Sequence, residues 1–375
     1  MNPKVSLVRC VSYDPDAVHA AVKQAVDFLG GIQEFIKPKE RVLLKPNLLT
    51  DATPEQCVTT HPEVLRAVIR LIKPVASHIF CGDAPNVWGQ EADVNRVYEV
   101  SGVKKVCQEE GVELCYFTHP EMVKGYPLTD WLDKCDKLVS IPKFKTHGLT
   151  LMSVAVKNLF GLVVGMSKTK IHIENPRSEE LSRILVDICA ARRPDLTIVD
   201  GIEALEGEGP GTSGKPKKMD LIAASADAFV LDMILARIMG LNPGDVATIR
   251  ISQDRGLALT DCDAVVSLGE PVENFMGKNF QLPKTAPLNK MPKALADLMK
   301  YFFVMKIRVV ASRCKACGRC FKICPACAIS LESGRIIFDD KKCIRCLCCQ
   351  EICPQGAIEV RRNLLWRILR RGQGA

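Results

Sequence analysis

The sequence contains no long hydrophobic run. None of its apolar stretches reaches the roughly 18 residues that a helix needs to span a bilayer, and residues 1–10 lack the apolar centre of a secretory signal. Both absences predict a cytoplasmic protein. Because the cytoplasm keeps thiols reduced, the 18 cysteines of the chain are expected to bind metal or to be buried rather than to form disulfides.

Sequence motifs for nucleotides are also missing. No G-x-G-x-x-G opens a helix, so the chain lacks the fingerprint of a flavin or nicotinamide site. Residues 209–215 match the G-x-x-x-x-G-K part of a phosphate-binding loop, but Pro216 stands where the Mg²⁺-binding hydroxyl belongs. We therefore predict a flexible glycine-rich lid over a site at the strand ends of the large domain rather than nucleotide hydrolysis.

Positive charge is concentrated towards the end of the chain. The net charge is +8, but the segment from Lys306 onward has 15 Lys plus Arg against 5 Asp plus Glu, which leaves the remainder near −2. No nucleic-acid recognition module accompanies this basic segment. The charge is therefore expected to offset a negatively charged metal site and to lie on a solvated face, and no nucleic-acid partner is predicted.

Ten cysteines lie between residues 314 and 353 in a repeated pattern. The run C-x2-C-x2-C-x3-C-P occurs twice, 29 residues apart. This is the pattern of bacterial ferredoxins with two [4Fe-4S] clusters, in which the fourth cysteine of each run binds the other cluster. The predicted ligands are Cys314, Cys317, Cys320 and Cys353 for one cluster and Cys343, Cys346, Cys349 and Cys324 for the other.

Zinc is the alternative metal for these cysteines. A zinc site would use paired C-x-x-C units and would leave several of them unused, so we favour the two clusters. Cys327 and Cys348 are surplus to the motif and are predicted to be small packed side chains.

These patterns divide the chain into four parts. An α/β domain is predicted at 1–275, a linker and helix at 276–305, an α+β ferredoxin-like two-cluster domain at 306–360, and a basic C-terminal helix at 361–375. The apolar side chains of this last helix share one face. We predict that it packs on the large domain, with anchoring to a membrane surface as the alternative.

Short apolar runs alternate with helical patterns through the large domain. The predicted strands are 41–44, 78–81, 137–141, 196–199, 221–224 and 264–268, and the predicted helices are 62–72, 95–109, 178–191, 226–239 and 245–253. This alternation predicts an α/β fold with a mainly parallel sheet and flanking helices.

Charged residues follow four of the predicted strands. They are Lys45 and Asn47, then Asp83, then Lys143, Lys145 and His147, and finally Asp200. Ligands of open α/β sheets bind outside the carboxyl ends of the strands, so four such ends of mixed charge predict one site.

A second group of polar residues is expected to join this site. Lys157 and Asn158 interrupt an apolar stretch, and a lysine is costly to bury unless its stem reaches solvent or it meets an anion. Lys168, Lys170 and His172 follow in a predicted polar loop, where His172 alone would be interpreted as a structural residue.

The quoted segments together resemble a known family. Lys45-Pro46-Asn47, Gly82-Asp83-Ala84-Pro85, Pro142 to His147, Lys157 to Gly161 and Asp200-Gly201-Ile202 are similar to the domain of unknown function 362. The resemblance covers about residues 4–270. Members are often fused to a two-cluster ferredoxin, and the family carries no settled activity. The resemblance supports treating the strand-end residues as one site.

Three functions are compatible with these patterns. The leading hypothesis is an iron-sulfur protein that couples ferredoxin-type electron transfer, with a soluble redox partner, to a redox reaction on a small anionic substrate or cofactor. The alternatives are a non-catalytic electron carrier or metallocentre assembly factor, and a non-redox anion- or metal-binding enzyme with structural clusters.

The leading hypothesis gives each predicted site residue a role. Lysines bind the anion, with Lys45, Asn47, Lys143, Lys145, Lys157 and Asn158 as the candidate binding residues. Asp83 and Asp200 bind a metal or move protons, and His147 acts as an acid or base.

Overall fold

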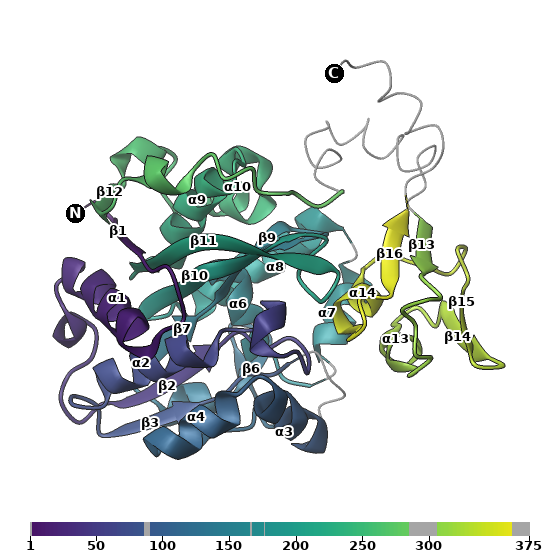
Figure 1. The fold of residues 1–375 in the computed structure, drawn as a ribbon, viewed down its shortest axis with the longest axis horizontal. Helices are drawn as coiled ribbons and strands as arrows, with labels where there is room; N and C mark the ends of the chain where they lie inside the picture. Colours follow the sequence, from purple (N-terminus) through teal and green to yellow (C-terminus); the bar gives the residue numbers. More distant parts are fainter. Residues whose placement is uncertain (1, 86–90, 166, 176, 285–305, 362–375) are drawn as a thin grey trace.

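The centre of the molecule is a ten-stranded mixed sheet (Figure 1). The structure is a computed structural model that describes residues 2–85, 91–165, 167–175, 177–284 and 306–361. The strands of the sheet are β1 (Lys4–Arg9), β2 (Arg41–Pro46), β3 (His78–Cys81), β4 (Glu113–Leu114), β7 (Lys137–Ile141), β8 (Lys143–His147), β9 (Leu151–Ser153), β10 (Leu196–Gly207), β11 (Gly214–Ser225) and β12 (Val266–Gly269).

Most strand pairs in this sheet are parallel. The order is β12-β1-β11-β10-β7-β2-β3-β4, and β8 pairs with both β10 and β9. Only the β1–β11, β10–β11 and β8–β9 pairs are antiparallel. The predicted mainly parallel α/β sheet is therefore confirmed.

Helices cover both faces of the sheet because its strands are apolar on both sides. In β2, Val42 and Leu44 pack with one group of helices, and Leu43 between them packs with the other. The first group is α1 (Pro15–Phe28), α2 (Pro62–Ile72), α3 (Glu91–Val100) and α4 (Val103–Glu110), and the second is α6 (Ala155–Asn158), α8 (Ser178–Ala191), α9 (Ala228–Ile238) and α10 (Ala247–Asp254).

Shorter elements complete the large domain. They are α5 (Trp131–Lys134), α7 (Ser167–Glu174), the hairpin of β5 (Pro120–Val123) and β6 (Tyr126–Thr129), and 3-10 turns at Ile32–Glu34, Pro54–Gln56, Leu159–Leu162, Pro243–Asp245, Cys262–Ala264 and Val272–Phe275.

Several predicted elements have the bounds that the structure shows, among them β3, β7, α2 and α8. The helix predicted at 95–109 is instead two helices, because Gly102 adopts a left-handed conformation, with φ of 79°, between α3 and α4. Strand β1 and helix α1 were not predicted. Residues 143–147, expected to follow a strand as a loop, form strand β8 after a single proline.

The glycine-rich segment is the tip of a hairpin rather than a flexible lid. Strands β10 and β11 extend past the rest of the sheet and reach the small cysteine-rich domain (Figure 1). There the Thr212 hydroxyl donates to the Cys353 carbonyl at 2.5 Å. Gly211 lies so close that a Cβ would stand 2.8 Å from the Glu351 carbonyl oxygen. The hairpin therefore docks the small domain, and glycine permits the close approach.

The small domain has two antiparallel strand pairs and two short helices. They are β13 (Lys306–Val309), α13 (Arg319–Ile323), β14 (Ile329–Glu332), β15 (Arg335–Phe338), α14 (Cys348–Ile352) and β16 (Ile358–Arg361), with β13 paired to β16 and β14 to β15.

The helix predicted before this domain and the basic C-terminal helix lie outside the described residues, apart from Arg361 at the end of β16. Of the helices that the structure describes, none is long and apolar enough to cross a membrane.

Candidate functional site

The eight predicted cluster ligands line two cavities in the small domain. The first has a volume of about 350 Å³ and the second of about 300 Å³. Cys314, Cys317, Cys320 and Cys353 line the first, and Cys324, Cys343, Cys346 and Cys349 line the second. The fourth cysteine of each run thus faces the cavity that the first three cysteines of the other run form.

The surroundings of these thiols suit an iron–sulfur cluster. Aliphatic side chains such as Ile336 and Ile329 fill the remaining walls. The backbone N–H groups of Ala328 and Ala357 donate to the sulfurs of Cys324 and Cys353 at 3.2 and 3.3 Å. Hydrogen bonds of this kind stabilise thiolate charge and help set the cluster potential.

A single metal ion suits the same cysteines less well. Across the described ranges, no three His, Cys, Asp or Glu side chains converge closely enough to hold one ion. Four thiolates around a cubic cluster stand farther apart than four ligands around zinc, which binds sulfur at about 2.3 Å. The residues therefore fit clusters.

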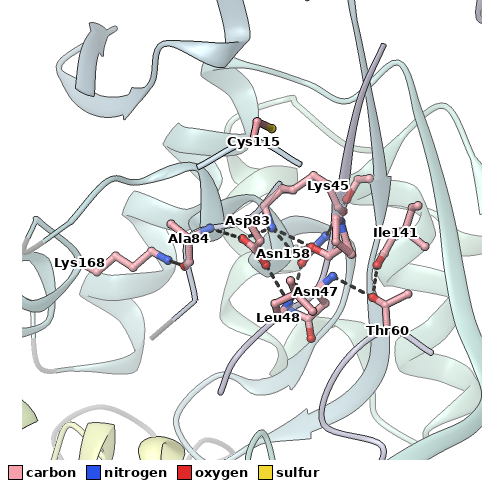
Figure 2. Close-up of polar contacts among 12 residues, drawn as sticks. Lys45, Asn47, Leu48, Thr60, Asp83, Ala84, Cys115, Ile141, Asn158 and Lys168 are labelled. Carbon is pink, nitrogen blue, oxygen red and sulfur yellow. Dashed lines mark hydrogen bonds and ion pairs between the residues drawn. The ribbon is translucent and has the colours of Figure 1, made fainter. Parts of the chain in front are cut away.

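In the large domain, Lys45 and Asp83 form a fully buried ion pair (Figure 2). The Lys45 ammonium donates to the Asp83 carboxylate at 2.8 Å, from the end of β2 to the segment after β3. Asp83 also accepts the backbone N–H of Leu48 at 2.7 Å. A Cβ on Gly161 would collide with both charged side chains, so glycine is required beside the pair.

Asn158 connects this pair to its surroundings. Its side-chain oxygen accepts from Lys45 at 3.3 Å and from the Asn47 amide at 3.1 Å, and its own amide donates to the Ser140 hydroxyl at 2.9 Å. Five side chains from four segments are thereby held in one network, of which Figure 2 shows Lys45, Asn47, Asp83 and Asn158.

The start of α6, the helix that carries Lys157 and Asn158, is held by Asp232. The Asp232 carboxylate accepts the backbone N–H groups of Ala155 and Val156 at 2.7 and 3.1 Å. Burial raises the pKa of Asp232 to about 7, although these two hydrogen bonds oppose the shift. Sequence reasoning missed Asp232 because it lies in the middle of an apolar helix.

A second buried pair joins Lys143 to Asp200 at 2.9 Å. The Tyr13 hydroxyl lies between them, accepting from Lys143 at 2.8 Å and donating to Asp200 at 2.9 Å. The Tyr13 ring stacks on His61 with ring centres 3.6 Å apart, and the His61 backbone N–H donates to Asp200 at 2.8 Å. Burial lowers the pKa of His61 to about 4.

Four predicted site residues thus form two buried ion pairs with one another. Lys45 and Lys143 contact aspartates, and both aspartates accept further hydrogen bonds from the protein. Tyr13 and His61 were not predicted to take part. Tyr13 follows strand β1, which was not predicted, and His61 lies 15 residues after the end of β2.

Between the two domains lies a cavity of about 490 Å³. Five predicted site residues reach its wall, and Lys168 and His172 join them. Pro210 comes from the glycine-rich segment that was predicted to cover the site, and sequence reasoning missed Glu351. The lining includes Asn47, Asp83, Lys145, Lys157, Asn158, Lys168, His172, Pro210 of the hairpin tip and Glu351 of the small domain.

Three lysines give this interdomain cavity an excess of positive charge. Lys157 has no hydrogen-bond or ion-pair partner in the described part of the chain, and desolvation lowers its pKa. Lys145 donates to the Val58 carbonyl at 2.8 Å, and Lys168 donates to the Ala84 carbonyl (Figure 2). Burial lowers the pKa values of Lys145 and Lys168 to about 7.

Two further polar atoms at the cavity are buried without a partner among the described residues. They are Nδ1 of His172 and the side-chain oxygen of Asn47. A buried polar atom that lacks a hydrogen bond is costly, so a polar ligand or water at this place would relieve that cost.

Glu351 closes the cavity from the small domain. Its Oε1 lies 3.1 Å from Nε2 of His147, whose Nδ1 accepts the backbone N–H groups of Leu149 and Thr150. Burial lowers the pKa of His147 to about 4. Burial alone would raise the pKa of Glu351, but His147 and Lys157 lower it to about 2. Glu351 is therefore a buried carboxylate, and both ring nitrogens of His147 face protein groups.

These features define an iron–sulfur protein of the ferredoxin type joined to an α/β domain with a charged interdomain cavity. Residues 42–237 match the family described as Domain of unknown function (DUF362), and residues 306–359 match the 4Fe-4S dicluster domain. The chain is also 32% identical to the thylakoid-associated protein sll1697 of Synechocystis sp. over 317 residues, which cover 82% of this chain and 97% of that protein. The chain belongs to the DUF362 family.

Two further relatives match shorter stretches of the chain. The putative electron transport protein YsaA of Escherichia coli is 39% identical over 67 residues, covering 16% of this chain and 43% of that protein. A ferredoxin-like protein in the nif region of Sinorhizobium fredii is 40% identical over 42 residues, covering 11% and 66%. No solved structure matches the chain. The matches support an iron-sulfur electron-transfer protein.

Proposed function

We propose that this protein couples electron transfer through two [4Fe-4S] clusters to a redox reaction on a small anionic ligand bound in the interdomain cavity. One observation carries the proposal. Glu351 lies in α14 between the predicted ligands Cys349 and Cys353, and it lines the same cavity as Lys157. The cluster-binding segment and the anion site therefore share one helix.

The two crossed cysteine sets support the two-cluster part of the proposal. When bound, each cluster would accept or donate one electron. Cys317 is the exposed predicted ligand, so the cavity of Cys317 offers a point of contact for a soluble redox partner. The name of the E. coli relative, a putative electron transport protein, agrees with this role.

The charges of the cavity support an anionic ligand. Asp83 is engaged by Lys45, which leaves Glu351 to face Lys145, Lys157 and Lys168. A carboxylate or phosphate group beside Lys157 would supply the partner that this lysine lacks. Such an anion would also favour the charged forms of Lys145 and Lys168, whose pKa values burial lowers to about 7.

A non-catalytic carrier is the second candidate, and a separate observation favours it. Asp83, Asp200 and His147 were predicted to act as acids, bases or metal ligands, yet each is held by neighbouring protein groups. In this case the cavity would bind its anion without converting it, and the clusters would only relay electrons.

Iron and sulfide counting tests the cluster proposal. Two clusters predict about eight irons for the anaerobically purified chain. Cys324→Ala and Cys343→Ala should each lose the same cluster, so their remaining EPR signals should agree with each other and differ from that of Cys314→Ala. An EPR match between Cys324→Ala and Cys314→Ala would contradict the crossed pairing.

Single-turnover experiments separate the redox enzyme from the carrier. Mass spectrometry of small molecules that copurify with the chain would identify the ligand. Cluster absorbance is then followed after this ligand is mixed with oxidised and with reduced protein. A change in cluster oxidation state together with a chemically altered ligand supports the enzyme, whereas binding with neither change favours the carrier.

A further inference from the structure

Helix α14 serves two sites at once. Its five residues, Cys348–Ile352, include the predicted ligand Cys349 and end directly before Cys353, a predicted ligand of the other cluster. The same helix supplies Glu351 to the wall of the interdomain cavity. Gln350 and Glu351 are each only 2% exposed, so the charge on this helix is shielded from water.

Packing around α14 keeps solvent away from the space between the two sites. The hairpin tip contacts the helix region through Thr212, which bonds to the Cys353 carbonyl, and through Gly211 beside the Glu351 carbonyl. Beside the hairpin tip, Gly148 donates its backbone N–H to the Gly209 carbonyl at 3.0 Å, and a Cβ on Gly148 would stand 2.8 Å from Leu347. Charges act on each other more strongly when water is excluded from between them.

We propose that anion binding beside Lys157 in the interdomain cavity depends on cluster oxidation state, so that the oxidised protein binds the anion tightly and the reduced protein releases it. The inference rests on the proposed function. Reduction places one electron, and so one added negative charge, beside α14. That added charge would repel the anionic ligand bound next to Lys157 and so weaken its binding, in addition to the constant repulsion from the Glu351 carboxylate.

The step is balanced without any bond being made or broken. One electron passes from a one-electron donor to one cluster, and the anion leaves the cavity with its charge unchanged. Because binding free energies are linked reciprocally, the anion must make reduction harder by the same factor by which reduction weakens its binding. A tenfold change in affinity corresponds to about 59 mV for a one-electron couple.

The test uses the full chain with its clusters, under anaerobic conditions. Binding of inorganic phosphate, sulfate and acetate is measured by calorimetry on oxidised and on electrochemically reduced protein. EPR-monitored redox titrations are run with and without each anion, with sodium chloride keeping the ionic strength equal. We expect at least one anion to bind about tenfold more weakly after reduction and to lower one cluster potential by about 59 mV.

Two variants and a matched control localise the effect. Lys157→Met should lose both the anion binding and the potential shift while keeping its full iron content. Lys170→Met removes a lysine on α7 whose side chain is 74% exposed and pairs with Glu174, so it should behave as wild type. Glu351→Gln should strengthen anion binding and raise the potential of the anion-free protein, because one fixed negative charge is removed.

The possible outcomes distinguish a failure of the redox coupling from a failure of the proposed function. Lys157-dependent binding with no change in potential would overturn the coupling and leave the proposed anion site standing. An equal potential shift in wild type and Lys157→Met would also overturn the coupling, because the shift would arise elsewhere. If none of the three anions binds in either oxidation state, both proposals fall.

Discussion

Lysines from the same sheet edge end in two different surroundings. At the strand ends, Lys45 and Lys143 contact carboxylates at 2.8 and 2.9 Å and are completely buried. At the interdomain cavity, Lys145 and Lys168 donate to backbone carbonyls, and Lys157 has no hydrogen-bond or ion-pair partner in the described part of the chain. The first group is neutralised by the protein, and the second is not.

This difference separates scaffold from binding site. A buried ion pair adds little net stability, but removal of one partner leaves an uncompensated charge in the interior. A desolvated cation without a partner is already unfavourable in the ligand-free protein. The two buried ion pairs therefore fix the segments that carry them, whereas the cavity lysines lack a compensating negative charge, which an anionic ligand could supply.

The largest expected effect comes from breaking the buried ion pair between Lys143 and Asp200. Lys143→Met should lower the free energy of unfolding by about 3–5 kcal/mol, because Asp200 would remain buried and charged. Urea unfolding followed by circular dichroism measures the change. Lys134→Met is the control, since the Lys134 side chain is 51% exposed and surface changes usually stay within about 0.5 kcal/mol. Equal effects of the two substitutions would remove the distinction between scaffold and surface lysines.

A pH series tests the cavity side of the comparison. Burial, with Lys157 and Lys168 nearby, lowers the pKa of His172 from its usual 6.5 to about 4. Between those two pH values the unfolded chain binds the proton and the folded chain does not, so stability falls as the pH falls from about 6.5 to 4. The shift amounts to as much as about 3 kcal/mol.

His172→Gln should remove the His172 part of this loss of stability. The unfolding free energy, measured at several pH values, should then fall less steeply below pH 6.5. The exposed His119 offers the control, because His119→Gln should leave the slope unchanged. An unaltered slope in His172→Gln would show that His172 is protonated in the folded protein.

The grouping of the eight predicted ligands around two cavities follows a local pattern of the sequence. Eight cysteines and two prolines repeat within 41 positions, from residue 314 to residue 354. The sheet was predictable for a similar reason, since short apolar runs specify buried strands such as β3 and β7. Strand β1, helix α1, the break at Gly102, the strand character of β8 and the full length of β10 and β11 were not predicted.

The contacts within the candidate site were not predictable in the same way. Tyr13 meets Lys143 across 130 positions, and Asp232 caps α6 across 77. Glu351 occupies a variable position of the cysteine motif, where the pattern assigns it no role. Lys45 at the end of β2 and Asp83 just after β3 lie where they were predicted, whereas Asp200 lies inside β10, which continues to Gly207. Which charges pair and which face a cavity depends on tertiary distances.

Removal of the unpartnered cavity lysine should have the opposite sign to removal of a paired one. Lys157→Met replaces a desolvated cation with an apolar side chain of similar length, so we expect the unfolding free energy to rise by about 1 kcal/mol. Urea unfolding without added anions measures it. Destabilisation as large as that of Lys143→Met would mean that the protein itself neutralises Lys157.

The smallest expected effect concerns an ion pair between the two domains. Arg319 of the small domain pairs with Asp51 of the large domain, with an N–O distance of 2.8 Å to one carboxylate oxygen. Although burial opposes it, hydrogen bonds from Arg319 and Arg96 lower the pKa of Asp51 to about 2. Because Arg319 is partly exposed and Asp51 keeps Arg96, Arg319→Gln should cost less than about 1 kcal/mol.

Its effect should instead be seen in local opening of the interface. Hydrogen exchange should become faster at residues 209–213 and in α14, where the hairpin and the small domain meet, and added salt should reduce the difference from wild type. Arg313→Gln is the matched control, since Arg313 pairs with Glu359 within the small domain. Faster exchange in both variants would show that the small domain loosens internally, and the closed cavity would then depend on the domain's own stability rather than on docking.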